Sequence, residues 1–427
     1  MRLGFVGVFV ALAGAATSAY ATEGYFQHGY GARQKALGGA GAADSRDATA
    51  TALNPAGLVH ADNEVDVSAS LFSPWREFNG GGAPATFTPI GEVESDSNLF
   101  LIPNLAASYR LSGNPFADVI AISLYGSGGL NTDYPGIARP GFPGPGIFQD
   151  GRLGVDLQQA LLSVAIAKTI APGLSVGIAP IVARQQIKIR GLAPFAAGSS
   201  DPANVSGNGL DVTWGVGVRG GVEWVAAPGL RFGVAGNSRI YSQPFEKYRG
   251  LFAEQGDFDI PASIQAGVAY DVTPSLTLLA DYRHIWFGSI KSIANSSTNA
   301  ALLGSGNGPG FGWDDVDVLK LGIEWRTSPV LTLRAGYSYA TNPISSRDAE
   351  FNILAPAVVQ NHFTAGFEYK WDRSWSVEFA GLYVPEETVS GVEIPPGNPG
   401  HGVDISMYQF EGTVGVKYKF GEDAPLK

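Results

Sequence analysis

The strongest constraint in this sequence is a strict alternation of apolar and polar side chains near its C-terminal end. One face of an extended chain carries Tyr408, Phe410, Gly412, Val414, Val416, Tyr418 and Phe420, and the other carries Gln409, Glu411, Thr413, Lys417 and Lys419. A period of two residues is typical of a β-strand with one apolar and one polar face. At about 3.3 Å per residue and a tilt of roughly 40°, the stretch from Phe410 to Phe420 rises about 25 Å, the height of the apolar band of a membrane barrel.

The same alternation recurs along most of the chain. It predicts fourteen strands, at 64–73, 98–111, 116–127, 154–170, 173–190, 209–226, 229–245, 259–272, 274–292, 315–327, 330–340, 361–371, 374–386 and 404–420. Tight turns at several boundaries alternate with long connections, which is typical of the two ends of an outer-membrane barrel. A soluble β-sandwich also alternates, but its strands are rarely this long. We therefore predict an all-β protein, a transmembrane antiparallel barrel of about 14 strands.

Composition agrees with a barrel and narrows the function. The mean hydropathy is only +0.06, and no run of about 18 apolar residues follows residue 21, as a membrane helix would require. The chain has no cysteine, which excludes thiolate metal sites and cysteine catalysis. Its 28 basic against 39 acidic residues give a formal charge of −11, which argues against a nucleic-acid partner.

The first 21 residues have the features of an export signal. Arg2 precedes the apolar stretch Leu3–Ala16, and Ala19–Ala21 form an Ala-x-Ala cleavage site. An uncleaved membrane anchor is the alternative, but the stretch is short for a span. We predict that residues 1–21 are removed and that the mature chain begins at Thr22.

The next segment, Thr22–Val59, is too rich in glycine and alanine to form a core of its own. We expect it to be a plug, or hatch, spanning 22–62 and seated inside a barrel formed by 63–420, with 421–427 as a C-terminal tail. Within the hatch, Asn54-Pro55 predicts a rigid corner before the first strand, because proline fixes its own φ and restricts the residue before it. An ordinary loop turn is the alternative.

Several motifs resemble one known family. The run Ala36–Ala42, the step Asp47-Ala48-Thr49 and the motif Asn54-Pro55-Ala56-Gly57-Leu58 resemble the N-terminal hatch of the FadL/TodX/OmpP1 outer-membrane transporters. Later segments also resemble that family, at Phe258–Ser263, Gly336–Pro343 and Asn361–Gly366. The chain departs from the family at its end, because residues follow Phe420 where an aromatic residue usually closes the last strand. The resemblance implies a Gram-negative outer-membrane carrier of long-chain fatty acids or aromatic hydrocarbons.

The family resemblance also implies an opening in the barrel wall at a kinked third strand. Gly126, Gly128 and Gly129 end that strand here, and glycine permits such a bend. A simple loop entrance is the alternative. In the hatch, the residues that we expect to take part in gating are Tyr25, Phe26, Asn54 and Pro55.

Two loops carry apolar residues where polar ones are expected. Ile137, Phe142, Ile147 and Phe148 lie in the connection after the third strand, and Leu192 and Phe195 lie in the 191–208 connection. Exposed apolar groups on an extracellular loop suggest a landing groove for a hydrophobic ligand, with the second loop as its other side. A low-complexity surface loop is the alternative.

A basic stretch follows on the fifth strand. Alternation places Arg184, Lys188 and Arg190 on one face, which we expect to be the lumen, with Ile187 and Ile189 in lipid. There the cations would bind the carboxylate of a fatty acid. Alternatively they pair with acidic residues of the hatch or wall such as Asp44, Asp47 or Glu324.

No catalytic constellation is evident. The stretch Gly215–Gly220 fits G-x-G-x-x-G but lies inside an alternating strand, whereas a dinucleotide site needs a strand-to-helix turn. The five histidines show no ligand spacing, and no G-x-S-x-G elbow is present. We therefore expect no enzyme activity, no cofactor and no metal.

The sequence thus predicts a passive outer-membrane uptake channel for hydrophobic small molecules. The ligand would be captured by the apolar loops and released sideways through the kinked third strand. A general hydrophilic porin and a structural outer-membrane protein are the alternatives. Other expected partners are outer-membrane lipid, lipopolysaccharide and the barrel-assembly machinery, and we expect a monomer.

Overall fold

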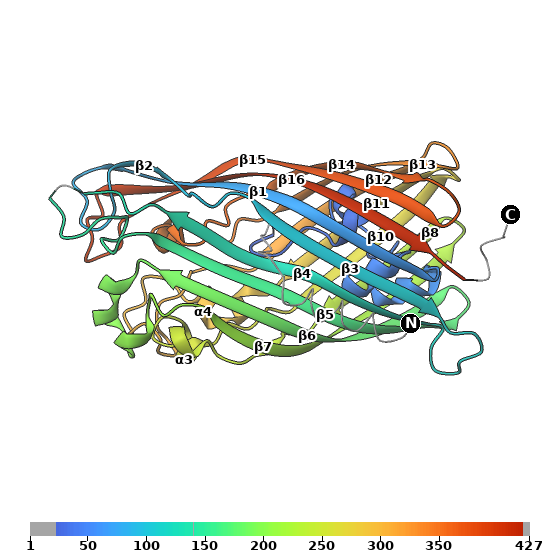
Figure 1. Cartoon of the computed structure of the whole chain (residues 1–427), viewed down its shortest axis with the longest axis horizontal. Coiled ribbons are helices and arrows are strands. Elements are labelled where there is room, and N and C mark those ends of the chain that lie inside the picture. Colours follow the sequence, from blue (N-terminus) through green and yellow to red (C-terminus); the bar gives the residue numbers. More distant parts are fainter. Residues whose placement is uncertain (1–22, 140, 422–427) are drawn as a thin grey trace.

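The computed structural model describes residues 23–139 and 141–421, so the predicted signal and most of the predicted tail lie outside the described residues. Within this part, sixteen strands form one antiparallel sheet, which closes because β16 pairs with β1 (Figure 1). Two of these strands are short additions, β2 (Gly91–Glu94) and β9 (Tyr241–Ser242). The remaining strands are the staves of a 14-stranded barrel, which confirms the predicted fold class.

The staves, in chain order, are β1 (Glu64–Gly82), β3 (Phe100–Arg110), β4 (Val119–Tyr134), β5 (Leu153–Ala171), β6 (Leu174–Arg190), β7 (Asp211–Ala227), β8 (Leu230–Asn237), β10 (Ser263–Thr273), β11 (Leu276–Ile285), β12 (Val316–Arg326), β13 (Leu331–Ala340), β14 (Asn361–Lys370), β15 (Trp375–Val392) and β16 (His401–Lys419). The helices are short: α2 (Gly31–Ala36), α3 (Ala253–Gly256), α4 (Lys291–Ala294) and the 3-10 turns η1 (Ala48–Ala52), η2 (Pro55–His60), η3 (Ala193–Gly198), η4 (Pro202–Asn204), η5 (Glu246–Tyr248), η6 (Phe287–Ser289), η7 (Ser346–Asp348) and η8 (Phe351–Ile353). Among the described residues, no helix has both the length and the apolar character needed to cross a membrane.

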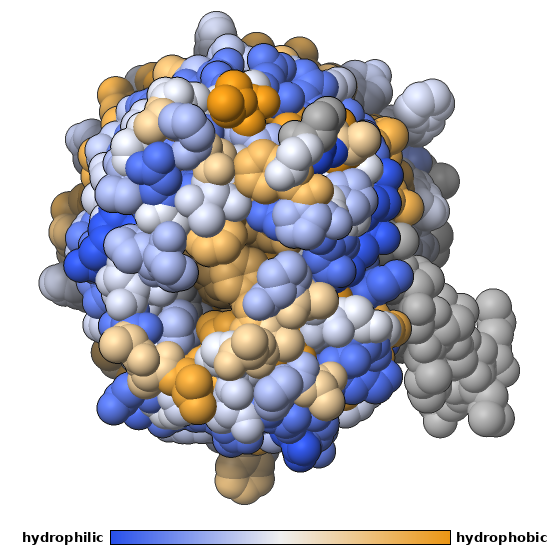
Figure 2. Space-filling model, turned by 90° about the vertical axis from the view of Figure 1, so that its left-hand side faces the viewer, coloured by the Kyte–Doolittle hydropathy of each residue, from blue (hydrophilic) through white to orange (hydrophobic). Residues whose placement is uncertain are grey.

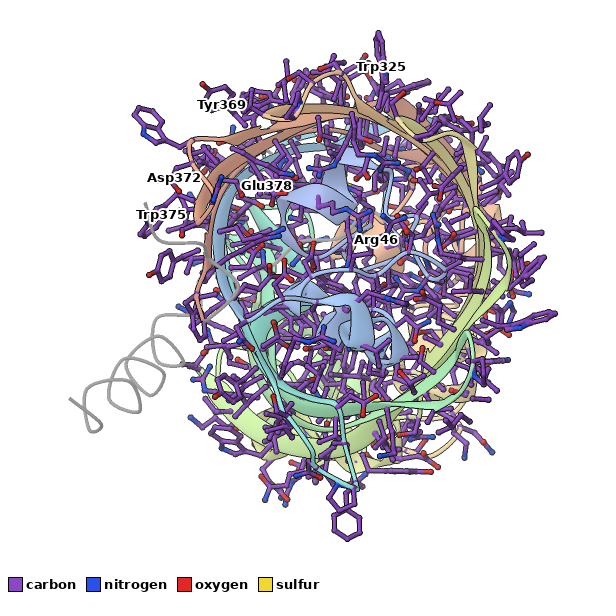
Figure 3. All side chains as sticks on the ribbon, turned by 90° about the vertical axis from the view of Figure 1, so that its right-hand side faces the viewer. Arg46, Trp325, Tyr369, Asp372, Trp375 and Glu378 are labelled. Atoms are coloured by element: carbon purple, nitrogen blue, oxygen red, sulfur yellow. The ribbon has the colours of Figure 1, made fainter. Side chains whose placement is uncertain are left out.

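Alternation along the staves sets the two faces of the wall. On β16 the predicted apolar face points outward, with Phe410, Val414 and Phe420 exposed, whereas Gln409 and Lys417 are buried inside. Short turns join the staves at one end and long connections at the other (Figure 1). At the short-turn end, Trp325 and Tyr369 point away from the barrel (Figure 3). Aromatic residues at this level are expected at the edge of the hydrocarbon layer.

Some strand ends differ from the prediction. β1, β4 and β15 continue several residues beyond their expected ends at the loop side, where β1 and β16 stay paired as far as Gly82 and His401. β8 instead ends early, at Asn237. The next residue, Ser238, still donates its N–H to Val218 O of β7 at 2.9 Å, but its hydroxyl, and not its carbonyl oxygen, accepts the Val218 N–H at 3.1 Å. A side-chain hydrogen bond of this kind, which competes with the backbone pairing, cannot be recognised from the alternation of apolar and polar residues.

The hatch lies inside the barrel. Almost every residue between 23 and 59 is buried, and α2 packs against β13 to β16 and β1 while η2 packs against β4 to β7. Viewed from the short-turn end, its ribbon occupies the ring of strands, with Arg46 inside the ring (Figure 3). The glycine-rich hatch cannot form a core of its own, and it is buried instead against the barrel wall.

Candidate functional site

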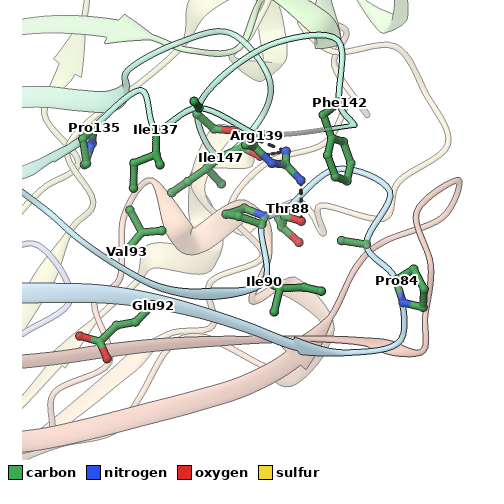
Figure 4. A pocket seen from close by; sticks show the side chains of 14 residues that line it. Pro84, Thr88, Ile90, Glu92, Val93, Pro135, Ile137, Arg139, Phe142 and Ile147 are labelled. Carbon is green, nitrogen blue, oxygen red and sulfur yellow. Dashed lines mark hydrogen bonds between the residues drawn. The ribbon is translucent and has the colours of Figure 1, made fainter.

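An apolar pocket of about 440 Å³ lies among the long connections (Figure 4). One wall is the segment after β4, with Ile137, Phe142 and Ile147. The other wall is formed by the connection after β1, including Ile90, and by β2, including Val93. Its aliphatic and aromatic lining suits a ligand that loses free energy in water.

Two charged residues hold the second wall of this pocket in place. Glu393 accepts the backbone N–H groups of Thr86 (2.9 Å), Phe87 (2.9 Å) and Thr88 (2.7 Å). Burial alone would raise the pKa of Glu393, but the N–H groups of Thr88, Asn398 and Thr86 and the Thr88 hydroxyl lower it to about 2. From the other side, Arg139 donates to the carbonyl oxygens of Phe87 and Thr88 and stacks on the Phe142 ring, 3.7 Å from its centre. The shape of the pocket therefore depends on one carboxylate and one guanidinium, which both hydrogen-bond to the backbone of residues 86–88.

The structure brings together three of the six apolar loop residues singled out by sequence. Ile137, Phe142 and Ile147 share the pocket, whereas Phe148 is buried beside it and packs edge-on against Phe195, with ring centres 5.1 Å apart. Leu192 is fully buried and does not line the pocket. The predicted second side was therefore wrong. The second wall is formed instead by residues 84–93. Their apolar side chains do not follow a strand period, so only their position in a loop could have indicated a pocket.

An aromatic cluster lies between the loops and the hatch. Tyr25 of the hatch contacts Phe26 and Phe287, with ring centres 4.8 Å and 5.1 Å away, and Phe287 contacts Trp313 at 5.3 Å. Phe258 stacks on Tyr25 from a neighbouring loop. Seen from the loop end, the molecule has a central hollow lined by hydrophobic residues (Figure 2). The hatch thus contributes aromatic side chains to the floor under the loops.

Buried apolar contacts run without a break from the loop pocket to the wall at β4. Ile147 of the pocket, Tyr25 and Phe26 of the aromatic cluster, and Tyr125 and Leu130 of β4 all belong to one contiguous cluster of buried residues. A hydrophobic molecule that passed between these packed side chains would stay out of water.

The wall is interrupted at β4, where the family resemblance implied a kink. The ladder between β3 and β4 ends at Asn104 and Tyr125, although β3 continues beside β1 as far as Phe100. The register between β4 and β5 shifts between Gly126 and Gly128, which is a bulge. β4 therefore leaves β3 at the three predicted glycines.

The hatch takes the place of β3 along this part of β4. Gln27 N–H donates to Ser127 O at 3.1 Å, and Gly129 N–H donates to Tyr25 O at 3.0 Å. The Gln27 side chain also donates to Gly126 O at 2.6 Å. A Cβ at Gly128 would lie 2.3 Å from Tyr25 O, so only glycine lets the two backbones approach. Tyr25 and Phe26 therefore lie at the interruption.

Asn54 and Pro55 lie elsewhere in the lumen. The Asn54 amide donates to Ala42 O at 2.6 Å and to Val222 O of β7 at 3.1 Å, and its carbonyl accepts Ala56 N–H at 3.1 Å. Asn54 is extended and caps η2, so the predicted corner is present. Asn54 therefore fixes the hatch to β7, and Pro55 lies beside Gly177 of β6.

Ion pairs fix the hatch to the opposite half of the wall. Glu23 pairs with Lys320 at 2.6 Å and Arg283 at 2.8 Å, and Arg33 pairs with Glu324 at 3.0 Å. Two further pairs join Lys35 to Glu411 and Asp47 to Lys417. These pairs could not be predicted from the sequence. A lysine or arginine on the polar face of a strand shows no sign of whether a charged residue of the hatch lies beside it.

The basic stretch on β6 faces the other way from the prediction. Ile187 and Ile189 are buried inside, and Arg184, Lys188 and Arg190 lie on the outward face. These cations therefore do not line the lumen, and they do not pair with Asp44, Asp47 or Glu324. Asp44 pairs instead with Arg33 at 2.7 Å and Arg231 at 3.2 Å.

Comparisons with known proteins agree with this architecture. The sequence profile of the family described as outer membrane protein transport protein (OMPP1/FadL/TodX) matches residues 9–394. The Pseudomonas putida toluene transporter TodX superimposes with a TM-score of 0.67 at 20% identity, covering 93% of this chain and 100% of that one. A Pseudomonas aeruginosa FadL homologue gives 0.67 at 14% identity (93% and 100% covered), and the Ralstonia pickettii toluene transporter TbuX gives 0.61 at 18% (92% and 99%). No curated protein sequence matches the chain.

Proposed function

Since this chain belongs to the family of outer membrane transport proteins OMPP1/FadL/TodX, we propose that it is a passive channel for the uptake of hydrophobic small molecules. The observation that carries the proposal is the unbroken apolar cluster between the loop pocket and the interrupted wall. A molecule that enters at the loops would stay in apolar surroundings as far as β4. Exposing it in an aqueous pore instead would cost about 0.8 kcal/mol per methylene.

Sideways release at β4 is the second part of the proposal. Hatch residues 25–27 supply the hydrogen bonds to β4 that β3 would otherwise supply. If this short segment moves, the wall has a gap between β3 and β4 that faces the bilayer. The solute would then pass from the aromatic cluster into lipid without crossing the periplasmic side of the hatch.

For the solute, we favour an uncharged hydrocarbon over a fatty-acid carboxylate. The cation that lines the loop pocket, Arg139, directs its donors to the carbonyl oxygens of Phe87, Thr88, Gly146 and Ile147. The β6 cations that suggested a carboxylate site face outward. TodX and TbuX, whose folds are similar, are toluene transporters.

An open hydrophilic porin is disfavoured because the hatch fills the lumen and is held by buried ion pairs. We expect the purified chain to show little ion conductance in planar bilayers. A steady open-pore conductance would contradict a plugged carrier.

The direct test compares uptake of radiolabelled toluene and palmitate by cells that carry the chain. Ile147→Asp places a charge in the pocket, and Leu302→Asp places the same charge on an exposed loop residue outside it. We expect Ile147→Asp to reduce toluene uptake at least fivefold and Leu302→Asp to leave it unchanged. Equal uptake by both variants would refute the pocket as the entry point, and palmitate uptake that exceeds toluene uptake would refute the choice of solute.

A further inference from the structure

The outward face of β6 changes character abruptly along its length. From the short turn upward it carries Val176, Ile178 and Val182, of which the last two are strongly exposed to the outside. Beyond Val182 the same face carries only Arg184, Gln186, Lys188 and Arg190. On a wall that faces lipid, such a change marks the edge of the hydrocarbon layer, because a cation within it is costly.

Two tryptophans on β7 indicate that this edge of the hydrocarbon layer lies at the outer leaflet. Trp214 and Trp224 both point outward, 52% and 50% exposed, and are ten residues apart, which corresponds to a rise of about 25 Å. Trp224 lies opposite Leu174 beside the short turn, and Trp214 lies opposite Arg184. Arg184 is therefore level with the aromatic girdle nearer the long loops, and Lys188 lies farther out, in the headgroup layer.

Of the three outward cations on β6, one is paired with a carboxylate and two are not. Arg190 pairs with Asp133 at 2.5 Å. Arg184 donates to Gln186 at 2.8 Å, Gln186 to Gln158 at 2.8 Å, and Gln158 to Asp156 at 3.0 Å. Within residues 23–139 and 141–421, neither Arg184 nor Lys188 has a carboxylate oxygen within 4 Å. Asp156 lies across from Lys188 in the strand register.

We propose that this patch, defined as Arg184, Lys188, Gln186, Gln158 and Trp214, binds a phosphorylated glycolipid of the outer leaflet, as in lipopolysaccharide. Arg184 and Lys188 contact a phosphate, for which a guanidinium and an ammonium are the suited partners. The Gln186 amide faces the sugar hydroxyls, and Gln158, which is bonded to Gln186 and Asp156, holds it in place.

Trp214 and the apolar face below it, including Val182, contact the first carbons of the acyl chains. Charge complementarity singles out this side of the barrel. The chain as a whole is acidic, and Glu77, Glu92 and Glu94 gather on the outward side of β1 and β2. An anionic lipid is repelled there and attracted at β6.

The experiment uses the mature chain refolded in micelles free of lipopolysaccharide, with folding checked by heat-modifiable gel migration. Bisphosphorylated lipid A is titrated while the melting temperature is recorded. We expect a saturable rise for the natural chain and at least tenfold weaker binding for Arg184→Ala combined with Lys188→Ala. The matched control is Lys168→Ala, which removes an outward cation of β5 near the short turns. Exchanging the two cations, Arg184→Lys with Lys188→Arg, should restore most of the binding.

Two further probes separate the possible ligands and need no variant. Dephosphorylated lipid A should bind much more weakly than lipid A, and millimolar inorganic phosphate should give no rise in melting temperature. Equal binding of lipid A by the double variant, or equal binding of dephosphorylated lipid A, would overturn the proposal. A rise with inorganic phosphate that matches the rise with lipid A would show a site for free phosphate and would also overturn it.

Discussion

The hatch meets the two halves of the barrel wall in different ways. On the side of β11 to β16 it is held by buried ion pairs, such as Arg33 with Glu324 and Glu23 with Lys320. On the side of β4 it is held by hydrogen bonds from residues 25–27 to a bulged strand. Breaking a buried ion pair costs about 3–5 kcal/mol, whereas the net contribution of one hydrogen bond is about 0.5–1.5 kcal/mol. We therefore expect the ionic half to anchor the hatch and the β4 half to be the place where it moves.

The largest effect is expected from breaking the anchor. Glu324→Gln removes the carboxylate that Arg33 and Arg334 both contact at 3.0 Å. Arg33 then keeps only its pair with Asp44, and Arg334 keeps its pairs with two other glutamates. We expect a loss of up to about 3–5 kcal/mol in hatch docking, because part of the buried positive charge is left uncompensated. Ion conductance in planar bilayers and protease cleavage within the hatch should both rise.

A matched control for the anchor is Asp96→Asn, which breaks an exposed pair with Arg152. Exposed pairs contribute about 0–1 kcal/mol, so conductance should stay low. If Glu324→Gln stays as closed as Asp96→Asn, the ionic half does not anchor the hatch, and the contrast between the two halves fails.

A smaller effect is expected at the mobile half, from Gly128→Ala. The added Cβ would lie 2.3 Å from Tyr25 O, so hatch residues 25–27 have to leave β4. We expect a loss of about 1–3 kcal/mol, as for overpacking elsewhere, and altered toluene uptake with little ion conductance. Gly412→Ala on β16 is the control, because nothing lies within 4 Å of its added Cβ. Unchanged uptake in Gly128→Ala would show that release does not pass β4.

Gln27→Ala tests the same contact more gently. It removes the 2.6 Å hydrogen bond from the Gln27 side chain to Gly126 O and leaves the backbone contacts in place. We expect a cost of about 0.5–1.5 kcal/mol and faster amide exchange at 126–129 by mass spectrometry. Exchange in α2, on the ionic side, should not change. Equal acceleration in α2 would mean that the hatch moves as one body.

The strand framework was predictable from sequence because each residue of a lipid-facing stave must point either outward or inward. The faces of β16 followed directly from this rule. On β6 the prediction from alternation was wrong. It assigned Ile187 and Ile189 to the lipid face and Arg184 and Lys188 to the lumen. Beyond the hydrocarbon layer the polarity reverses: the inner face packs under the loops in the apolar cluster, and the outer face meets headgroups and water. Alternation gives the two faces of a strand but not which one is inside.

The candidate site was predictable only in part. Ile137, Phe142 and Ile147 were found because apolar residues in a loop are unusual, and Gly126 to Gly129 were found through the family resemblance. The pocket wall at 84–93 and the grip of Glu393 and Arg139 on residues 86–88 depend on contacts between loops about 50 to 300 residues apart. No local pattern encodes which loops meet, so these features needed the structure.

The smallest expected effect is a pH dependence of the loop that covers the β4 half. Glu350 accepts Ile394 N–H at 2.7 Å, and in the same loop Leu354 O accepts the Thr132 hydroxyl of β4 at 2.8 Å. Burial raises the pKa of Glu350 from 4.5 to about 7, with the nearby Glu393 adding to the rise and the Ile394 N–H opposing it. The folded loop therefore binds the proton more tightly than the unfolded chain does.

It follows that the docking of this loop weakens as pH rises from about 4.5 to about 7 and is constant above that window. Glu350→Gln keeps the shape but cannot ionise, so its loop should be equally protected from protease at pH 5 and pH 8. In the natural chain, cleavage within 341–360 should be faster at pH 8. A pH dependence of hatch cleavage that Glu350→Gln abolishes would mean that the two halves are coupled through this loop.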